Sequence, residues 1–172
     1  MSRTITQVTE EQYTALYGIM ALAGEYMHRV LDLSHWYPFP PSDWFIKHCE
    51  NRDVFAVHDG ELLIGTFNLG EEPEPYYLED MSDYWTHHDI PALYFSAFAL
   101  LPSHQQQGIG TWCMTQVDKL VQARGYEQVR FDAVNTHPKL KQFYRNCGYQ
   151  ECGILDLGQT AVMCFEKRFT AE

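Results

Sequence analysis

Gln105-Gln106-Gln107-Gly108-Ile109-Gly110 is the stretch that decides the fold of this chain of 172 residues. It follows an apolar run, Leu93–Leu101, which predicts a strand, and it precedes Thr111–Arg124, whose apolar residues recur at helical spacing. A loop between a strand and a helix presents backbone N–H groups at the helix N-terminus, where an anion such as pyrophosphate binds well. The stretch therefore predicts an anion site, although two glycines alone are more typical of an ordinary strand–helix turn.

The composition of this loop narrows the kind of anion site. Gly108 and Gly110 carry no Cβ atom, so a phosphate can approach the backbone closely. The loop contains no Lys or Arg, so the amides and the helix dipole would bind the anion. A dinucleotide fingerprint would place its third glycine at Cys113, which disfavours that site. A Walker loop is excluded because the chain contains no Gly-Lys-Ser/Thr.

A second segment, His137-Pro138-Lys139-Leu140-Lys141-Gln142-Phe143-Tyr144-Arg145-Asn146-Cys147-Gly148-Tyr149, follows a predicted strand at Tyr126–Ala133. Together the two segments resemble the GCN5-related N-acetyltransferase (GNAT) superfamily over about the last half of the chain. Gln105, Gly108 and Gly110 match its pattern of Gln or Arg, two residues, Gly, any residue, then Gly or Ala. The second segment matches at Tyr144, Gly148 and Tyr149, but His137 stands where the family usually has Asn, with Asn135 two residues upstream.

The resemblance implies a fold and a cosubstrate. The implied fold is an α/β mixed sheet of about seven strands with about four helices, in a single N-acetyltransferase domain over residues 1–172. The local patterns give the order strand, two helices, three strands, helix, strand, helix, two strands, which is the arrangement of that fold. The implied cosubstrate is acetyl-CoA, with pantetheine paired to a strand backbone and pyrophosphate on the loop amides. The implied cofactor-binding residues are Phe98, Ala99, Leu100, Gln105, Gln106, Gln107, Gly108, Ile109, Gly110, Thr111 and His137.

Acetyl transfer to an amine needs a base for the amine and an acid for the leaving thiolate. The resemblance implies that Tyr144 is the acid, since an ordinary phenol is protonated at neutral pH; the alternative is a core aromatic. The strand position where some family members carry a Glu base holds Tyr94 instead. The base is left open among Tyr94 and Ser96 through ordered water, Glu79, Asp80, His87, His88, Asp89 and Asp132. Burial of Asp132 would raise its pKa, although pairing with Arg130 or another donor is the favoured interpretation.

The acceptor pocket is expected from two aromatic segments, Ser34–Pro41 and Tyr76–Asp80. Aromatic walls and carboxylates suit a cationic or aromatic amine, so we expect a small-molecule primary amine as acceptor. Trp36 and Phe39 have a structural alternative, which is to anchor their loop to the core. Two other functions are kept open: a non-catalytic acyl-CoA-binding or sensor module, and a protein or peptide N-acetyltransferase.

Composition excludes several classes of protein. A formal charge of −11 argues against nucleic acid as the main partner. We expect no metal, because the histidines and cysteines lack the spacing of a metal site, and no membrane partner, because no apolar run is long enough to span a bilayer. The five cysteines contain no Cys-x-x-Cys pair. Cys113, Cys147 and Cys164 lie in predicted helix or strand and indicate reduced core thiols in a cytoplasmic protein. A homodimer is left open.

The remaining elements are predicted from local patterns. A strand is expected at Ile5–Val8, followed by a helix with a capping box from Thr9 to Gln12. Ser42 is expected to cap a second helix. The Asp59-Gly60 pair predicts a hairpin turn between strands at 54–57 and 62–69. A long acidic and aromatic loop is expected over 70–89, and a terminal hairpin around Gly158.

Overall fold

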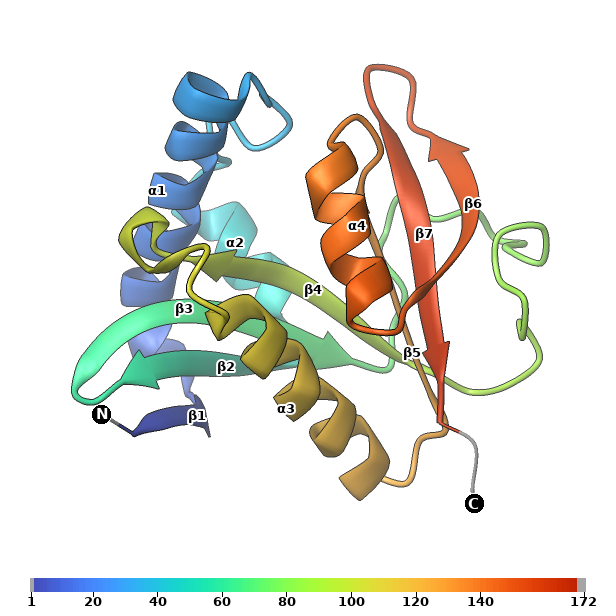
Figure 1. Cartoon of the computed structure of the whole chain (residues 1–172), viewed down its shortest axis with the longest axis horizontal. Coiled ribbons are helices and arrows are strands. Elements are labelled where there is room, and N and C mark those ends of the chain that lie inside the picture. The colour runs from blue at the N-terminus through green and yellow to red at the C-terminus, as the bar shows by residue number, and fades with distance from the viewer. Residues whose placement is uncertain (1, 170–172) are drawn as a thin grey trace. The chain divides into compact units, whose positions relative to one another are not determined.

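The computed structural model describes residues 2–169, and its elements follow the predicted order. They are β1 (Arg3–Gln7), α1 (Tyr13–Leu31), α2 (Ser42–Cys49), β2 (Arg52–Asp59), β3 (Leu62–Gly70), β4 (Leu93–Leu100), α3 (Ile109–Ala123), β5 (Gln128–Val134), α4 (Pro138–Asn146), β6 (Gln150–Asp156) and β7 (Ala161–Arg168) (Figure 1). Within the described residues, the seven strands form one sheet in the order β1-β2-β3-β4-β5-β7-β6. The mixed sheet and the four α-helices confirm the predicted fold class.

The chain divides into two compact units. The first unit contains Met1–Gly70 and Ser96–Cys113, and the second contains Glu71–Phe95 and Met114–Glu172. Both β4 and α3 are therefore shared, with the start of β4 in the second unit and its end in the first. A single domain over residues 1–172 stays a prediction.

In the first unit, β1, β2 and β3 form an antiparallel meander. Ile5 of β1 lies opposite Val57 of β2, and Phe55 of β2 lies opposite Phe67 of β3. The hairpin between β2 and β3 turns at Gly60, whose φ of 62° is a left-handed conformation that glycine adopts without a steric cost. The Asp59-Gly60 signal therefore predicted this turn correctly.

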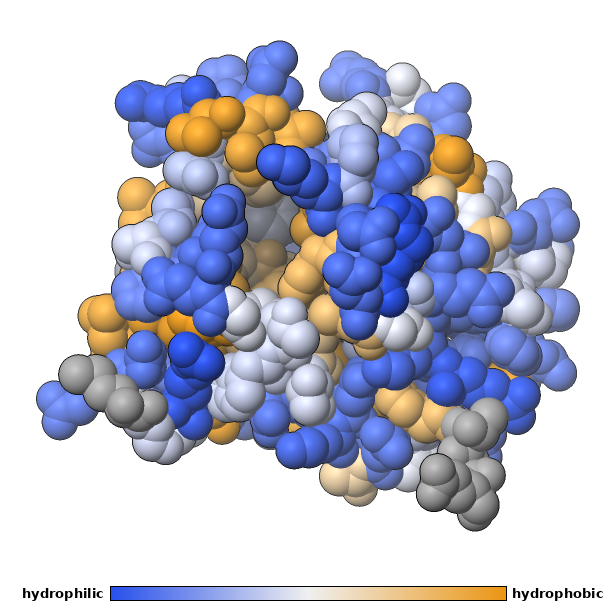
Figure 2. All heavy atoms as spheres, viewed as in Figure 1, coloured by the Kyte–Doolittle hydropathy of each residue, from blue (hydrophilic) through white to orange (hydrophobic). Residues whose placement is uncertain are grey.

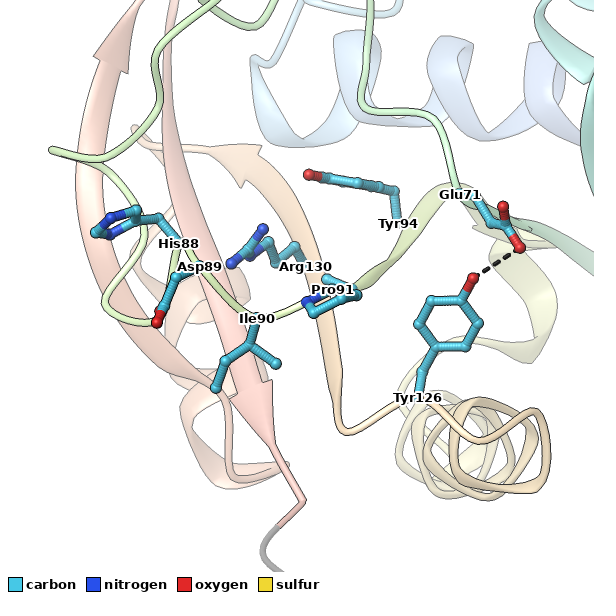
Figure 3. A pocket seen from close by; sticks show the side chains of 9 residues that line it. Glu71, His88, Asp89, Ile90, Pro91, Tyr94, Tyr126 and Arg130 are labelled. Carbon is cyan, nitrogen blue, oxygen red and sulfur yellow. Dashed lines mark hydrogen bonds between the residues drawn. The ribbon is translucent and has the colours of Figure 1, made fainter.

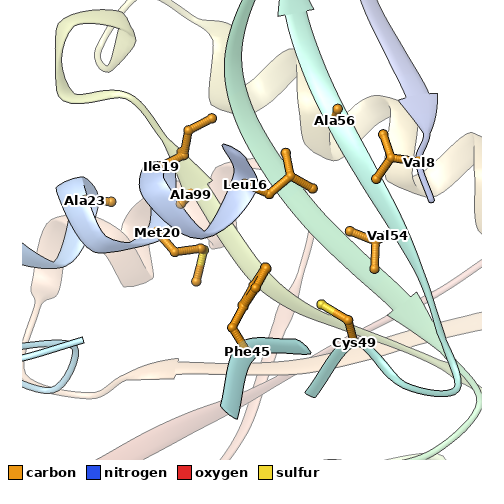
Figure 4. Close-up of a cluster of buried hydrophobic side chains, with 10 residues drawn as sticks. All are labelled: Val8, Leu16, Ile19, Met20, Ala23, Phe45, Cys49, Val54, Ala56 and Ala99. Atoms are coloured by element: carbon orange, nitrogen blue, oxygen red, sulfur yellow. The ribbon is translucent and has the colours of Figure 1, made fainter. Parts of the chain in front are cut away.

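The core of the first unit lies between its helices and its strands (Figure 4). α1 contributes Leu16, Ile19, Met20 and Ala23, which recur at one-turn spacing and so share one face of the helix. The cluster is completed by Val8, Phe45, Cys49, Val54, Ala56 and Ala99. Burying each large apolar side chain of this kind contributes about 1.5–3 kcal/mol, so the face of α1 fixes the helix on its strands.

Two predicted helix caps are wrong. Thr9 makes no side-chain capping hydrogen bond, because residues Glu10–Gln12 form a short 3₁₀ helix closed by a backbone bond from Gln12 N to Thr9 O. As a result α1 begins only at Tyr13. Ser42 is the first residue of α2 rather than its cap, and Pro41 takes the cap position without a side-chain hydrogen bond. Both patterns named polar residues near a helix start but misplaced the start itself.

In the second unit, β5, β7 and β6 are antiparallel neighbours, and β4 pairs in parallel with β5 at Leu93 and Tyr94. The terminal hairpin turns at Gly158 as predicted, but β6 begins at Gln150, four residues before the expected Ile154. Residues 71–92 contain no helix or strand, in agreement with the predicted loop. This segment is held by Trp85, which is 4% exposed and packs with Leu155, Val162 and Cys164 of the hairpin.

Hydrophilic residues cover much of the face drawn in Figure 2, in keeping with the net charge of −11. None of the helices in the described part of the chain is long and apolar enough to cross a membrane. The predicted reduced thiols are free cysteines in the structure. Cys113 and Cys164 are buried, whereas Cys147 is only half-buried at the end of α4 and is not a core residue.

Candidate active site

The glycine loop joins β4 to α3 in the first unit. Its side chains brace its own backbone: Gln105 Nε2 donates to Leu100 O at 3.1 Å, and Gln107 Nε2 donates to Ser103 O at 2.8 Å. The first helical bond that enters α3 runs from Trp112 N to Gly108 O. The amides of Ile109 and Gly110 therefore belong to the first turn, which has no helical carbonyl to accept from them. The positive end of the α3 dipole lies at the same place.

Gly108 has the conformation and the space that an anion site requires. Its φ is 75°, which lies in the left-handed region where a Cβ is strained. A Cβ added there would meet no heavy atom within 4 Å, so the backbone faces open space rather than packed side chains. Gln106 also has a positive φ, of 59°. Two such residues within three positions turn the chain sharply into α3.

β4 is distorted where the pantetheine was expected. Ala97 adopts a φ of 51° inside the strand, which re-aims the backbone of the residues that follow. Ala99 and Leu100 are buried. They approach β3 closely, because a Cβ on Gly65 would lie 2.8 Å from Ala99 O and 2.6 Å from Leu100 Cδ2. Glycine at position 65 therefore makes room for the end of β4.

Tyr144 lies in the second unit, on α4, and is only 6% exposed. Its ring packs on Phe131 at 4.6 Å and on Phe165 at 5.2 Å between centroids. Burial raises the pKa of Tyr144, and the nearby Cys147 and Asp132 raise it further. The phenol is therefore neutral and fixed in orientation at physiological pH, which is the state that can donate a proton.

His137 is the N-cap residue of α4 and makes no side-chain capping bond. Its carbonyl accepts the amides of Leu140 and Lys141, at 3.1 and 3.2 Å. The nearby Asn135 is occupied differently, because its Oδ1 accepts a hydrogen bond from Lys141 Nζ at 3.0 Å. Of the two residues that could replace the family's Asn, Asn135 is thus tied to α4 by its side chain.

Asp132 lies on β5 and is bound by two tyrosines of the 71–92 segment. The hydroxyls of Tyr76 and Tyr77 donate to its Oδ2, at 2.8 and 2.6 Å. Burial raises the pKa of Asp132, while the two tyrosine hydrogen bonds act to lower it. The predicted pairing with Arg130 or another donor is confirmed for another donor: the partners are the two tyrosine hydroxyls, while Arg130 donates to the carbonyl of His87.

Arg130 belongs to a second buried polar group in the same unit. Its guanidinium lies over the ring of Trp85 at 5.4 Å, and its Nε is 3.9 Å from Glu166 Oε2. Glu166 is 1% exposed and pairs with His87 Nδ1 at 3.1 Å. No sequence pattern indicated this group, since its members come from three separate segments. It fixes the end of the 71–92 segment on β5 and β7.

An open cavity of about 410 Å³ lies beside β4 and β5 in the second unit (Figure 3). It is lined by Glu71, His88, Asp89, Ile90, Pro91, Ala92, Tyr94, Tyr126 and Arg130. Two of the lining residues bind each other, because the Tyr126 hydroxyl donates to Glu71 Oε1 at 2.6 Å. Three of the candidate bases, Tyr94, His88 and Asp89, therefore share one cavity.

The other candidate bases are placed elsewhere. Asp80 accepts the backbone amide of Ser82 at 2.9 Å and is exposed, as is Glu79. His87 is engaged by Glu166. Ser96 lies in the first unit, and its buried Oγ has no hydrogen-bond partner. Among the described residues, no group of three or more His, Cys, Asp or Glu side chains is placed to hold a metal ion.

The predicted site residues fall into two sets. Phe98–Leu100 and the glycine loop come together in the first unit, whereas His137, Tyr144 and Asp132 belong to the second. The aromatic segment at 34–41 lies in the first unit, where Trp36 and Phe39 pack against the core cluster. Gly24 of α1 allows that approach, since a Cβ there would clash with the carbonyl of Trp36.

A family model described as the acetyltransferase (GNAT) family matches residues 12–149. No curated protein matches the chain. Among solved structures, the ribosomal-protein-S18-alanine N-acetyltransferase from Escherichia coli is similar with a TM-score of 0.71 at 13% identity, covering 99% of this chain and 96% of that one. A spermidine N-acetyltransferase chimera from Vibrio cholerae and hSSAT is similar with a TM-score of 0.68 at 15% identity, covering 98% and 96%.

A third similar structure was solved with acetyl-CoA bound. It is a GNAT family acetyltransferase from Elizabethkingia anophelis, with a TM-score of 0.67 at 14% identity, covering 97% of this chain and 98% of that one. At such identities these likenesses concern the fold, and the family follows from the match over residues 12–149.

Proposed function

Because the chain belongs to the acetyltransferase (GNAT) family and is an acyltransferase that uses acetyl-CoA as cosubstrate, we propose that it acetylates the primary amine of a small molecule by direct transfer. The observation that carries the donor half of this proposal is Gly108 at the start of α3. Its φ is 75°, and no atom beyond its chain neighbours lies within 4 Å of the place that a Cβ would take. A pyrophosphate needs such an exposed backbone at a helix N-terminus.

The residues proposed to hold acetyl-CoA follow from this geometry. The amides of the loop, Gln105–Thr111, would bind the pyrophosphate, and the glutamine side chains would keep the loop in shape. The backbone of Phe98, Ala99 and Leu100 would pair with pantetheine, since the left-handed Ala97 turns these groups away from a regular ladder. His137, at the start of α4, is proposed as a further contact. Bound acetyl-CoA would supply an activated acetyl group as its thioester.

Tyr144 is proposed as the acid that protonates the leaving thiolate. Its raised pKa keeps the phenol protonated at neutral pH, so a proton is present for transfer to the thiolate. The aromatic cluster of Phe131, Tyr149 and Phe165 fixes the ring, so that little reorganisation is needed at the moment of transfer.

The acceptor is proposed to be cationic or aromatic. In the second unit, the 71–92 segment brings carboxylates and aromatic rings together, with Asp132 between Tyr76 and Tyr77 and with Glu71 beside Tyr126. Carboxylates attract an ammonium group, and aromatic faces bind it by cation–π contact. The Vibrio cholerae neighbour is named for spermidine, a polyamine, which favours the same class.

A protein or peptide acceptor is the second candidate, since the Escherichia coli neighbour is named for an alanine of a ribosomal protein. A non-catalytic acyl-CoA sensor is a further alternative. We also propose a cytoplasmic location, supported by five cysteines that are all free. Small molecules rather than nucleic acids or membranes are the proposed partners, supported by the net charge of −11. A homodimer remains compatible with these proposals.

The test is a screen of acceptors monitored by release of free thiol. Polyamines, amino acids, aminoglycosides, aromatic amines and short peptides with free N-termini are compared at equal concentration. The proposal expects a small cationic or aromatic amine to give the highest kcat/KM. A peptide as the best acceptor would contradict the small-molecule class, and tight CoA binding without transfer to any amine would favour the sensor.

A further inference from the structure

The side chains on the two faces of β5 contact different parts of the second unit. Phe131 points to the face where Tyr144 and Tyr149 pack, at 4.6 and 4.9 Å between ring centroids. Successive side chains of a strand point to opposite faces, so Gln128, Arg130 and Asp132 share the other one. All three bind the 71–92 segment: Gln128 and Arg130 donate to the carbonyl of His87, and Asp132 accepts from Tyr76 and Tyr77. Asp132 therefore lies across the strand from the proposed acid.

Tyr76 and Tyr77 both bind the Asp132 carboxylate through the same one of its two oxygens. Both tyrosine hydroxyls converge on Oδ2, so neither of these bonds uses Oδ1. The two tyrosine rings meet edge to face at 5.2 Å, and Tyr77 also contacts Trp85 at 5.8 Å and Tyr94 at 6.2 Å between centroids. These aromatic contacts restrain the carboxylate, which is itself half-buried.

The titratable groups around Asp132 come from three directions. Glu74, Tyr76 and Tyr77 face it from the 71–92 segment, Cys164 from β7, and Tyr144 interacts with it electrostatically from α4. Burial is the largest influence and raises the pKa of Asp132, and Glu74 adds to the rise. The hydrogen bonds from Tyr77 and Tyr76 act against it. A carboxylate whose pKa is brought toward neutral pH is a better proton acceptor than an ordinary aspartate.

We propose that Asp132 is the base that takes the proton from the acceptor amine, with Tyr76 and Tyr77 as the residues that position it. The proposal rests on the proposed function, since it assigns a role within the same transfer. Two other carboxylates of the second unit fit less well. Glu166 is occupied by His87 and lies near Arg130, while Asp80 is exposed and tied to Ser82.

The proposed step conserves protons and electron pairs. The ammonium of the acceptor gives one proton to Asp132, which passes it to solvent. The freed lone pair forms the C–N bond to the acetyl carbon, and the C–S bond breaks. The departing thiolate takes the proton of Tyr144, and the second proton lost by the nitrogen returns to Tyr144 through solvent. One ammonium and one thioester thus give one amide, one thiol and one proton.

The first experiment compares Asp132→Asn with the wild type and with Asp83→Asn as a matched control. Asp83 is an exposed residue of the 71–92 segment, so its variant has the same change of charge. The amide side chain of Asp132→Asn would keep an oxygen that both tyrosines can bond. We expect kcat to fall by about 100-fold or more, in the range of general base catalysis. The affinity for CoA measured by calorimetry should stay unchanged, and Asp83→Asn should behave as wild type.

The second experiment reads the pH profile, which a merely structural role would not move. Removing a hydrogen bond that lowers the pKa of Asp132 must raise that pKa, so Tyr77→Phe should shift the acidic limb of kcat/KM to higher pH. In the Asp132→Asn variant, the acidic limb of the kcat/KM profile should disappear. Titration of ¹³C-labelled aspartate by nuclear magnetic resonance gives the same shift without any acceptor. An Asp132→Asn variant with wild-type kcat and an unchanged acidic limb would overturn the proposal.

Failure of the proposed function would look different. If the wild type prefers peptides to small amines, the small-molecule assignment fails, and the same variants are then assayed on the preferred peptide. A loss of rate in Asp132→Asn on that peptide would still support the base. A normal rate with a good small amine would leave the small-molecule assignment standing and remove Asp132 as the base.

Discussion

Replacement of Gly108 tests the proposed pyrophosphate site most sharply, with Gly108→Ala and Gly108→Glu as a matched pair. A Cβ at this position would meet no heavy atom beyond its chain neighbours within 4 Å, so the Cβ of either variant has room. Both must hold a φ near 75°, which costs about 1–2 kcal/mol for a residue with a Cβ. For a chain of 172 residues, this lowers the melting temperature by roughly 2–8 °C. The cost is shared by the pair and cancels in their comparison.

The two variants differ in the charge beside the loop amides. Two unit charges about 4 Å apart repel by about 4 kcal/mol at an effective dielectric constant of 20. A flexible glutamate can turn toward solvent and avoid much of this repulsion. We therefore expect Gly108→Glu to bind CoA about 10- to 100-fold more weakly than Gly108→Ala, which corresponds to about 1.4–2.8 kcal/mol.

The assay is calorimetric titration of CoA, performed below the melting temperature of both variants. Pantetheine serves as the control ligand, because a fragment without the pyrophosphate should bind both variants equally. Equal affinity of the two variants for CoA would refute the placement of the pyrophosphate at this loop.

Three further predictions concern the second unit and the core. Tyr144→Phe should lower kcat with little change in CoA affinity by calorimetry, whereas an unchanged rate would mean that water protonates the thiolate. The pKa of Asp132 is higher in the folded protein than its ordinary value of 3.8. Ionisation of this carboxyl therefore disfavours the folded state above pH 3.8, and the lost stability returns as the pH falls below the raised pKa. Asp132→Asn should therefore raise the melting temperature more at pH 7 than at pH 4, and an equal effect at both would contradict the raised pKa. Leu16→Ala should cost about 2–5 kcal/mol in denaturant unfolding, against well under 1 kcal/mol for the exposed Leu22→Ala on the same helix.

The features that the sequence predicted well are those that depend on local patterns. The turn at Asp59-Gly60 and the loop before α3 each place glycine where the backbone has a positive φ, at Gly60 and Gly108. The face of α1 is equally local, because Leu16, Ile19, Met20 and Ala23 recur at the period of a helix. The capping patterns at Thr9 and Ser42 failed because a cap depends on where the helix starts, and the 3₁₀ turn at Glu10–Gln12 moved that start.

The features that the sequence did not predict depend on distant contacts. Tyr76 and Tyr77 were expected at an acceptor pocket, but nothing in the 71–92 segment indicated that they would bind Asp132, more than 50 residues away. The same holds for the group of His87, Arg130 and Glu166, whose members belong to the loop, β5 and β7. The left-handed conformation of Ala97 within β4 could likewise not be predicted from the sequence, because alanine gives no signal of a positive φ.

The proposed reaction is tested most directly by competition in a single vessel. Acetyl-CoA is supplied in limiting amount with the wild-type protein, a mixture of small cationic and aromatic amines, and an equal concentration of peptides with free N-termini. Mass spectrometry then identifies which molecules carry a new acetyl group, and thiol titration counts the CoA released. The account predicts that the acetyl groups lie on a small cationic or aromatic amine, with one thiol released for each group transferred. Acetyl groups found mainly on peptides, or thiol release without any acetylated amine, would contradict it.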